Sequence, residues 1–479
     1  MKKFNLRNLA SSLFVLFTLT LVIFVVENSF IIPSLVVKSF EITYFVIFAV
    51  FAISLIVFYI MYSLQDNNYK RVYLIVGIVS AILLINLVVV FLLPDDFVFS
   101  YKNRNDELTE ITIEIKQDYR LRSILLTALT FVFLLMFLIV YPRKKHARNT
   151  FIAIIIFYLI LCYILIGYSL IKEFPIYRKT ITLGIANRGG ETRSLFVNRN
   201  LFASYLFVGL VFCVYLSSIM KKHRYVPILV SLPIAVIIFF TYSKTKIALS
   251  AFVYIAYALA IIILNFKKHP VIVTTLLLAF IGFVTSAVLL RVMPVHSETE
   301  LGILLRKIFP DSLFTGDSLR ARITYWKVGM AALKSNWWTY VFGEGFYISR
   351  MILGEALATL GHAVPSMPYG NYHNGYVELW ANVGIIGLVA YLVFLIYMVY
   401  IYIRIFKYHK LFSLYSFIAL GALLIHSSVE AITPFLFNSE GIIHALPVFM
   451  PQLIYYYHIK EAEGQAGGKH NITNEPVLP

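Results

Sequence analysis

The sequence is built from long apolar runs. Segments of roughly 18 to 25 predominantly apolar residues recur along the chain, and this length lets an α-helix cross the hydrocarbon core of a bilayer. Hydrophobic residues make up 60% of the 479 residues and charged residues only 14%, a balance that soluble domains do not need. The predicted fold class is therefore an all-α integral membrane protein, and we expect no nucleic-acid partner.

Twelve of these runs are predicted to be transmembrane helices. The first follows Lys2 and Lys3 in the manner of a signal peptide. It is long enough to span a membrane and no small-residue cleavage site follows it, so we expect it to remain as a helix. The predicted spans lie near residues 9–26, 40–64, 72–93, 122–141, 150–171, 201–220, 225–241, 247–265, 271–290, 377–403, 411–430 and 441–458.

Basic residues in alternate short loops set the predicted orientation, because Lys and Arg are retained on the cytoplasmic side of a membrane. With the N-terminus inside, the N-terminal tail and five alternate loops hold 17 basic residues against one acid, Asp66. A shift of the frame by one helix would break this pattern in every loop. Both termini are therefore predicted to be cytoplasmic.

The chain is predicted to divide into four parts. Residues 1–183 hold the first five helices, residues 184–403 form a core that includes the outer loop 291–372, residues 404–458 hold the last helices, and residues 459–479 form a flexible cytoplasmic tail. The loop 291–372 is too short for a separate enzyme domain of ordinary size. We interpret it as a partly helical lid on the extracytoplasmic side.

Two local patterns lie in the predicted outer segments. Residues 110–115 alternate between apolar and polar side chains, which predicts a short strand. In the lid, an amphipathic helix is predicted to begin at Asp317 or Ser318 and to lie on the membrane surface or against the helix bundle. Its apolar stripe consists of Leu319, Ile323, Trp326, Met330 and Leu333.

The predicted outer segment 172–200 carries a surplus of positive charge. Six cations stand against two acids, Glu173 and Glu191, on the side of the membrane where cations are disfavoured. The surplus favours either an anionic ligand at the outer membrane surface or contact with lipid phosphates. The cations are Lys172, Arg178, Lys179, Arg188, Arg193 and Arg199.

A histidine motif follows the predicted lid. His373 and Asn374 are followed, after nine residues, by Gly384 and Gly387 inside the predicted span 377–403. This spacing resembles the signature of the O-antigen ligase and polysaccharide polymerase superfamily, whose members move glycans from a polyprenyl pyrophosphate. We interpret the two glycines as packing residues that let neighbouring helices approach closely.

Further stretches are similar to motifs of this superfamily and occur in the same order. They are Asn198-Arg199-Asn200, Ser243-Lys244, Arg322 with Trp326, and Gly343-Glu344-Gly345. The resemblance covers roughly residues 184–403. Lys244 stands where many members have an arginine, and an ammonium group lacks the planar fork of a guanidinium group. Lys246 is therefore expected to share the binding of the pyrophosphate with Lys244.

The resemblance implies a membrane glycosyltransferase that uses no cofactor, metal or nucleotide sugar. The implied donor is an undecaprenyl-pyrophosphate-linked glycan, and the implied acceptor is a hydroxyl group of a glycan or of the lipid A core. The implied active site lies on the extracytoplasmic face of a bacterial inner (plasma) membrane, among membrane lipids.

Such a transfer needs a base for the acceptor hydroxyl and cations for the departing pyrophosphate. His373 is the predicted base. Arg322 is the predicted catalytic cation. Its neighbour Arg320 competes for this role, but residues two apart on a helix point about 200° apart and cannot both face one phosphate. Arg322 is favoured because only it keeps the family spacing to Trp326. The predicted substrate-binding residues are Lys244, Lys246, Arg320, Arg188, Arg193, Arg199 and Asn374.

Two other functions stay open. A polymerase of the same superfamily would differ from a ligase only in its acceptor, and the complete His-Asn to Gly-x-x-Gly spacing favours a ligase. A lipid-linked glycan transporter is the alternative from another class, but Glu41, Glu378 and Glu430 lie near the ends of predicted spans and not at the bilayer midplane.

No metal site is predicted. His426, Glu430, Glu440 and His444 form two pairs spaced by four residues at neighbouring span ends, which makes a metal site an alternative. Pairs of this kind more often form local hydrogen bonds. Cys162 and Cys213 fall inside predicted spans and are interpreted as small packing residues.

Overall fold

The computed structural model describes part of the chain, namely residues 84–102, 108–117, 119–121, 123–124, 144–183, 192–196, 199–220, 223–264, 317–361 and 372–430. A helical stretch at residues 84–92 comes first. The labelled elements are β1 (Asp96–Lys102), β2 (Leu108–Glu114), α5 (Lys144–Lys172), α6 (Phe174–Leu183), α7 (Arg199–Ile219), α8 (Tyr225–Phe240), α9 (Lys244–Leu264), α12 (Asp317–Lys334), α13 (Trp337–Phe342), α14 (Ile348–Thr359), α15 (Gly375–Phe406) and α16 (Lys410–Val429).

Five of the described helices are long and apolar enough to cross a membrane. They are α5, α7, α9, α15 and α16, and they coincide with five of the predicted spans. Helix α8 occupies a sixth predicted span, but it has only 16 residues. The other predicted spans lie wholly or partly outside the described residues, so the number of twelve helices stays a prediction.

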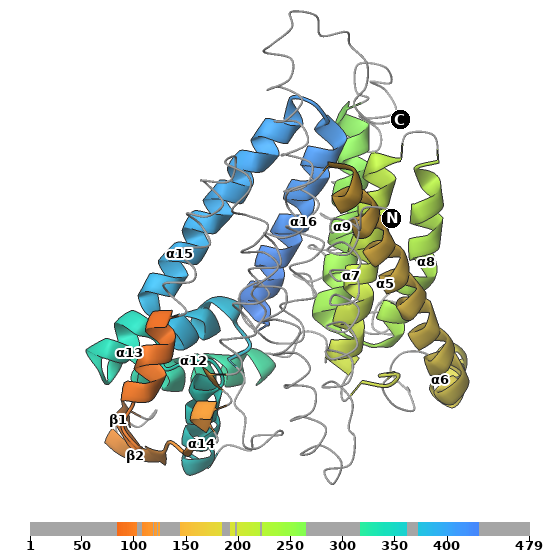
Figure 1. The fold of residues 1–479 in the computed structure, drawn as a ribbon. Coiled ribbons are helices and arrows are strands. Elements are labelled where there is room, and N and C mark those ends of the chain that lie inside the picture. The colour runs from red at the N-terminus through yellow and green to blue at the C-terminus, as the bar shows by residue number, and fades with distance from the viewer. Residues whose placement is uncertain are drawn as a thin grey trace, which may run out of the picture.

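Helix α7 is the centre of the bundle. Of its span, 89% is buried, and α5, α8, α9 and α16 pack around it (Figure 1). The ring of Tyr158 on α5 stacks on that of Tyr205 on α7 with centroids 4.5 Å apart, and its hydroxyl donates to the Tyr205 carbonyl oxygen. Cys162 and Cys213 are buried and form no disulfide, in agreement with the packing role expected of them.

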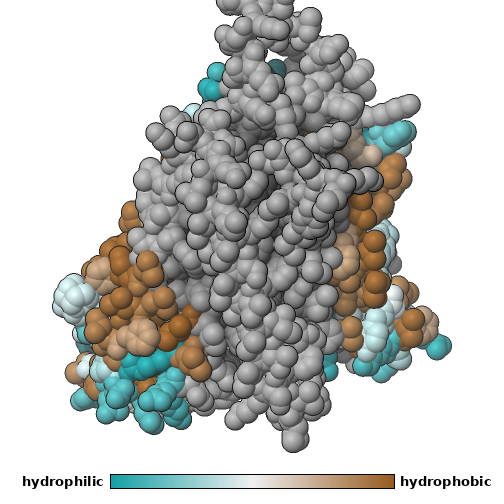
Figure 2. All heavy atoms as spheres, in the orientation of Figure 1, coloured by the Kyte–Doolittle hydropathy of each residue, from teal (hydrophilic) through white to brown (hydrophobic). Residues whose placement is uncertain are grey.

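The flanks of the bundle expose apolar side chains. On α8, Leu229, Leu232 and Val236 are each about half exposed, and Figure 2 shows the apolar surface on this side of the molecule. A contiguous apolar flank is unfavourable in water and suits contact with lipid. The apolar helices and their exposed flanks therefore point to a membrane protein.

Part of the basic segment 172–200 is helical. Residues 174–183 form α6, which is separated from α5 by a short break. Pro175 accounts for the break, because proline lacks an N–H group and is tolerated only in the first turn of a helix. Tyr177 and Thr180 of α6 are buried, whereas Arg178 and Lys179 are exposed.

A second hydrophobic core lies at one end of α15. Strands β1 and β2 form an antiparallel hairpin in which Asp96 pairs with Glu114, and this confirms the strand expected at residues 110–115. The hairpin packs against α12 and α14 (Figure 1). The core residues include Val90, Phe97, Ile111 and Ile352.

The helix expected from Asp317 or Ser318 is confirmed as α12, but its buried face differs in part from the expected stripe. Val328, Ala332 and Leu333 are buried, whereas Ile323 is 39% exposed. The helix packs against the hairpin and against the start of α15, so it lies against other elements of the protein. Burial is decided here by the tertiary neighbours, and the repeat of apolar residues along one helix does not reveal them.

A kink in α15 fixes the crossing with α13. Gly384 has φ 68° and ψ −174° inside the helix, and a Cβ atom built there would overlap the Val341 carbonyl. The kink frees the carbonyl groups of Ala381 and Asn382, which accept hydrogen bonds from the backbone N–H groups of Glu344 and Gly345. The residues expected to be packing glycines thus include one that the backbone conformation itself requires.

The first prediction concerns this crossing. Gly384→Ala should lower the free energy of unfolding by about 1–3 kcal/mol from backbone strain, and the overlap with Val341 adds to this loss. Gly421→Ala is the matched control, because a Cβ atom at Gly421 on α16 meets nothing within 4 Å. Thermal unfolding of the two purified variants in detergent measures the difference. Equal unfolding midpoints would contradict the proposed constraint.

Candidate functional site

The backbone holds His373 firmly on both sides. Tyr372, directly before it, is fully buried, and its carbonyl oxygen accepts a hydrogen bond from Trp326 Nε1 at 2.6 Å. Asn374, directly after it, is the N-cap of α15, and its side-chain oxygen accepts from the N–H groups of Tyr376 and Val377. Between these anchors His373 has φ 48°, a conformation that few non-glycine residues adopt and that its neighbours must maintain.

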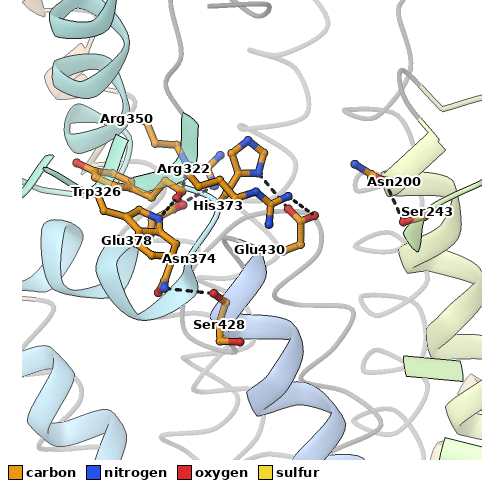
Figure 3. Close-up of polar contacts among 11 residues, drawn as sticks. Asn200, Ser243, Arg322, Trp326, Arg350, His373, Asn374, Glu378, Ser428 and Glu430 are labelled. Carbon is orange, nitrogen blue, oxygen red and sulfur yellow. Dashed lines mark hydrogen bonds and ion pairs between the residues drawn. The ribbon is translucent and has the colours of Figure 1, made fainter. Parts of the chain in front are cut away.

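The side chain of His373 lies in a cluster of charged groups (Figure 3). Its Nδ1 atom is 3.2 Å from Oε2 of Glu430, at the C-terminal end of α16. The other carboxylate oxygen, Oε1, is 3.6 Å from Nη2 of Arg322 on α12. The ring of Tyr325, one turn further along α12, stacks on the imidazole with centroids 6.2 Å apart. Three elements far apart in the sequence therefore meet at one carboxylate.

Glu430 stays ionised although it is buried. Burial alone would raise the pKa of this carboxyl group. The pKa is instead lowered to about 2, because the neighbouring positive groups outweigh burial. These groups are Lys246, His373, which also forms a hydrogen bond, and Arg322. The side chain of Lys246 is fully buried near the start of α9. Among the residues that the structure describes, none hydrogen-bonds to its ammonium group.

A second ion pair lies close to the first cluster. Arg350 on α14 donates from Nε to Oε1 of Glu378 on α15 at 2.6 Å, and Glu378 is buried. Glu378 also interacts electrostatically with His373. Because this pair joins one cation to one carboxylate, it is balanced in charge, unlike the cluster around Glu430.

Two of the motif stretches meet across α7 and α9. The hydroxyl of Ser243, directly before α9, donates to the side-chain oxygen of Asn200 on α7 at 2.9 Å. Figure 3 draws this pair on the opposite side of the view from His373. Helix α9 packs against α16, so the elements that carry Ser243, Lys246 and Glu430 are neighbours.

For the remaining predicted site residues, the structure gives positions but few side-chain contacts. Arg199 is the first residue of α7 and is half-buried, and Arg193 is exposed in the stretch before it. The carboxylate of Glu173 accepts the backbone N–H of Arg193 at 3.0 Å. Arg188 lies outside the described residues, as do the side chains of Lys244 and Arg320.

The sequence predicted His373 and Arg322 as site residues, but it did not predict that Glu430 joins them. The interacting carboxylate is 57 residues from His373 in the sequence, and only the fold brings the two together. The single signal was an acidic residue at the end of an apolar run. In the metal alternative Glu430 was paired with His426, but its carboxylate faces His373 and Arg322. Glu440 and His444 lie outside the described residues, and the described ones include no group of three potential metal ligands.

The fold and the site define a helical membrane protein in which a histidine, an arginine and a lysine surround one buried carboxylate. Residues 229–392 match the family model described as O-antigen ligase, so this segment of the chain is similar to that family. The matched segment contains Lys246, Arg322 and His373 and ends before Glu430. No curated protein matches the chain.

The second prediction concerns Asn374, which uses its side-chain oxygen to cap α15 and donates from Nδ2 to the Ser428 carbonyl at 3.2 Å. Asn374→Ala removes the cap and should lower the free energy of unfolding by about 0.5–2 kcal/mol. Asn374→Asp keeps an acceptor for the cap and should keep most of the stability. Thermal unfolding in detergent compares the two variants. If the alanine variant were as stable as the aspartate variant, the cap would not hold the start of α15.

Proposed function

We propose that this protein is a membrane glycosyltransferase that moves a glycan from undecaprenyl pyrophosphate to an acceptor hydroxyl on the extracytoplasmic face of a bacterial inner (plasma) membrane. The observation that carries the proposal is the contact of His373 with Glu430, the carboxylate that Arg322 also contacts, in a chain whose residues 229–392 match the O-antigen ligase family model. A base and an anion site thereby lie side by side, as this transfer requires.

The charge of the cluster suits a pyrophosphate. Arg322 contributes a guanidinium group and Lys246 an ammonium group, and Glu430 is the carboxylate that faces Arg322 and interacts electrostatically with Lys246. One negative charge against two positive charges leaves a surplus that an anionic ligand can neutralise. The buried ammonium group of Lys246 strengthens the argument. No residue in the described part of the chain hydrogen-bonds to it, and a buried cation is unfavourable until an anion or another acceptor reaches it.

The same cations act during the reaction. As the bond from the anomeric carbon to the pyrophosphate breaks, negative charge grows on the departing oxygen, and a guanidinium group can hold it through two parallel hydrogen bonds. Arg322 is the proposed partner for this charge, with Lys246 and Lys244 as supporting cations. Arg199, Arg193, Arg188, Arg320 and Asn374 remain candidates for further contacts with the donor.

His373 is the proposed base. Its side chain is 30% exposed, so an acceptor can reach a ring that is partly shielded from water. Imidazole accepts protons near neutral pH, which suits a base for a sugar hydroxyl. The ring of Tyr325 lies against the imidazole and limits its orientation.

Ligase activity is the favoured form of the reaction. A glycan linked to the lipid carrier and a sugar of the lipid A core both present a hydroxyl to the same base, so a polymerase is the second candidate of the same class. A lipid-linked glycan transporter is the candidate of another class. The contact of Glu430 with a histidine at the end of a span favours chemistry over transport, because transporters commonly place such groups near the bilayer midplane.

The third prediction concerns the sidedness of the site. Figure 1 places β2, which holds the exposed Glu110, at one end of α15, and the exposed Lys407 is the C-cap at the other end of this helix. Glu110→Cys should therefore react with a membrane-impermeant thiol reagent in intact cells, and Lys407→Cys only after lysis. The native Cys162 and Cys213 are buried and give little background. The reverse labelling pattern would place the site on the cytoplasmic face and overturn the proposed orientation.

The fourth prediction separates the base from the cation. His373→Ala should slow glycan transfer at least about 100-fold and leave donor affinity nearly unchanged, because it removes proton transfer and little charge. Arg322→Ala should weaken donor binding about 10-fold and also slow turnover, since the pyrophosphate is charged before and after the reaction. Arg322→Lys should recover part of the loss. Donor affinity and initial rate are measured with purified protein, a polyprenyl-pyrophosphate glycan and an acceptor.

Two controls accompany this measurement. His223→Ala removes an exposed histidine between α7 and α8 and should leave the rate unchanged. Transfer is also measured with a metal chelator, which should not reduce it, because the proposed reaction stabilises the leaving group with side-chain cations. A near-normal rate for His373→Ala would refute the assigned base, and loss of transfer with chelator that added metal restores would refute the metal-independent reaction.

A further inference from the structure

Glu430 is held in place by the end of α16. The residue is the C-cap of this helix in an extended conformation, with φ −138° and ψ 153°, and its N–H donates to the His426 carbonyl at 2.9 Å. Its side chain is only 10% exposed. Because the carboxylate is both anchored and buried, it presents a fixed acceptor to whatever lies beside it. That neighbour is the imidazole of His373.

The contact determines which nitrogen of His373 carries the proton. An ionised carboxylate can only accept hydrogen bonds, so Nδ1 must be the donor across the 3.2 Å separation. A neutral imidazole has one proton on its two nitrogens. With that proton on Nδ1, the other nitrogen, Nε2, is unprotonated and can accept a proton. The low pKa of Glu430, about 2, keeps the carboxylate ionised over the range in which a histidine can act as a base.

We propose that Glu430 is a positioning residue, which holds His373 in the tautomer with the proton on Nδ1 and so leaves Nε2 to take the proton of the acceptor hydroxyl. This inference rests on the proposed function and adds to it a residue outside the matched segment 229–392. Glu430 acts through His373 and need not touch either substrate.

The proton transfer accompanies a displacement at the anomeric carbon of the donor. The acceptor oxygen forms a bond to the anomeric carbon, and the bond from this carbon to the pyrophosphate oxygen breaks. The electron pair of the broken bond leaves with the polyprenyl pyrophosphate. The proton of the hydroxyl moves to Nε2 of His373, and Glu430 stabilises the imidazolium cation through Nδ1–H. The imidazolium later returns its proton to solvent or to the departing pyrophosphate.

The charges around His373 determine the direction in which Glu430→Gln should shift the pH profile of transfer. Arg322 on α12 and Lys246 on α9 act on the carboxylate that the imidazole contacts. From α15 the imidazole interacts with the carboxylate of Glu378, which pairs with Arg350 on α14. Removing the charge of Glu430 leaves the two cations uncompensated. The neutral imidazole is then favoured over the imidazolium, and the surplus positive charge toward the donor increases.

The test is the pH profile of transfer by Glu430→Gln. At neutral pH the rate should fall at least about tenfold, because the imidazolium loses its counter-ion. The acidic limb of the profile should move to lower pH by about one pH unit or more. Donor affinity should stay equal or increase. Glu430→Asp keeps the charge and should keep the position of the acidic limb, even if its shorter side chain lowers the rate.

A double variant separates positioning from a merely structural role. If Glu430 acts through His373, then Glu430→Gln combined with His373→Ala should be no slower than His373→Ala alone. Independent effects would multiply. Glu355→Gln is the matched control, because Glu355 on α14 interacts with Tyr119 and lies outside the cluster. It should leave the rate and the pH profile unchanged.

The outcomes distinguish this inference from the function on which it rests. If His373→Ala were inactive while Glu430→Gln had a normal rate and a normal pH profile, the proposed role of Glu430 would be refuted but the proposed function would stand. A normal rate for His373→Ala would overturn both. If Glu430→Gln folded poorly, the profile of Glu430→Asp would decide, because an acidic limb shifted despite the retained charge would also contradict the proposal.

Discussion

A single buried carboxylate connects the parts of this structure. Glu430 sits at the end of α16, faces His373 before α15 and Arg322 on α12, and lies in the field of Lys246 on α9. Isolated charges are expensive to bury, so four elements converge where their charges compensate one another. The positive surplus that remains gives the cluster its proposed preference for an anionic donor. The packing that stabilises these elements therefore also determines the chemistry of the site.

The kink in α15 makes this convergence possible. Gly384 lets α13 cross the helix at backbone contact, and the carbonyl groups released by the kink bind the N–H groups of Glu344 and Gly345. These two carbonyl groups thus keep hydrogen-bond partners, which matters most where water is scarce. The crossing holds the three helices α12, α13 and α14 beside the start of α15. Arg322 and His373 are consequently held on rigid elements, as a preorganised site requires.

The sequence predicted the membrane class and several helices well, because the apolar runs of α5, α7, α9, α15 and α16 have the length and composition of helices that cross a membrane. It also predicted the strand near residue 110 and the helix from Asp317. Local patterns could not predict α6, whose residues are mixed in polarity, or the left-handed conformation of His373. The family-like spacing identified His373 and Arg322, but the contact with Glu430 joins distant segments, and no spacing within one segment encodes it.

We propose that the cluster around Glu430 serves transfer of a glycan and not its passage across the bilayer. The most direct measurement uses the wild-type protein in lipid nanodiscs with a labelled polyprenyl-pyrophosphate glycan and a hydroxyl acceptor. The account predicts that one polyprenyl pyrophosphate is released for every glycan linked to the acceptor. If no glycan were linked, while the same protein in vesicles moved the intact donor from one leaflet to the other, the account would be wrong.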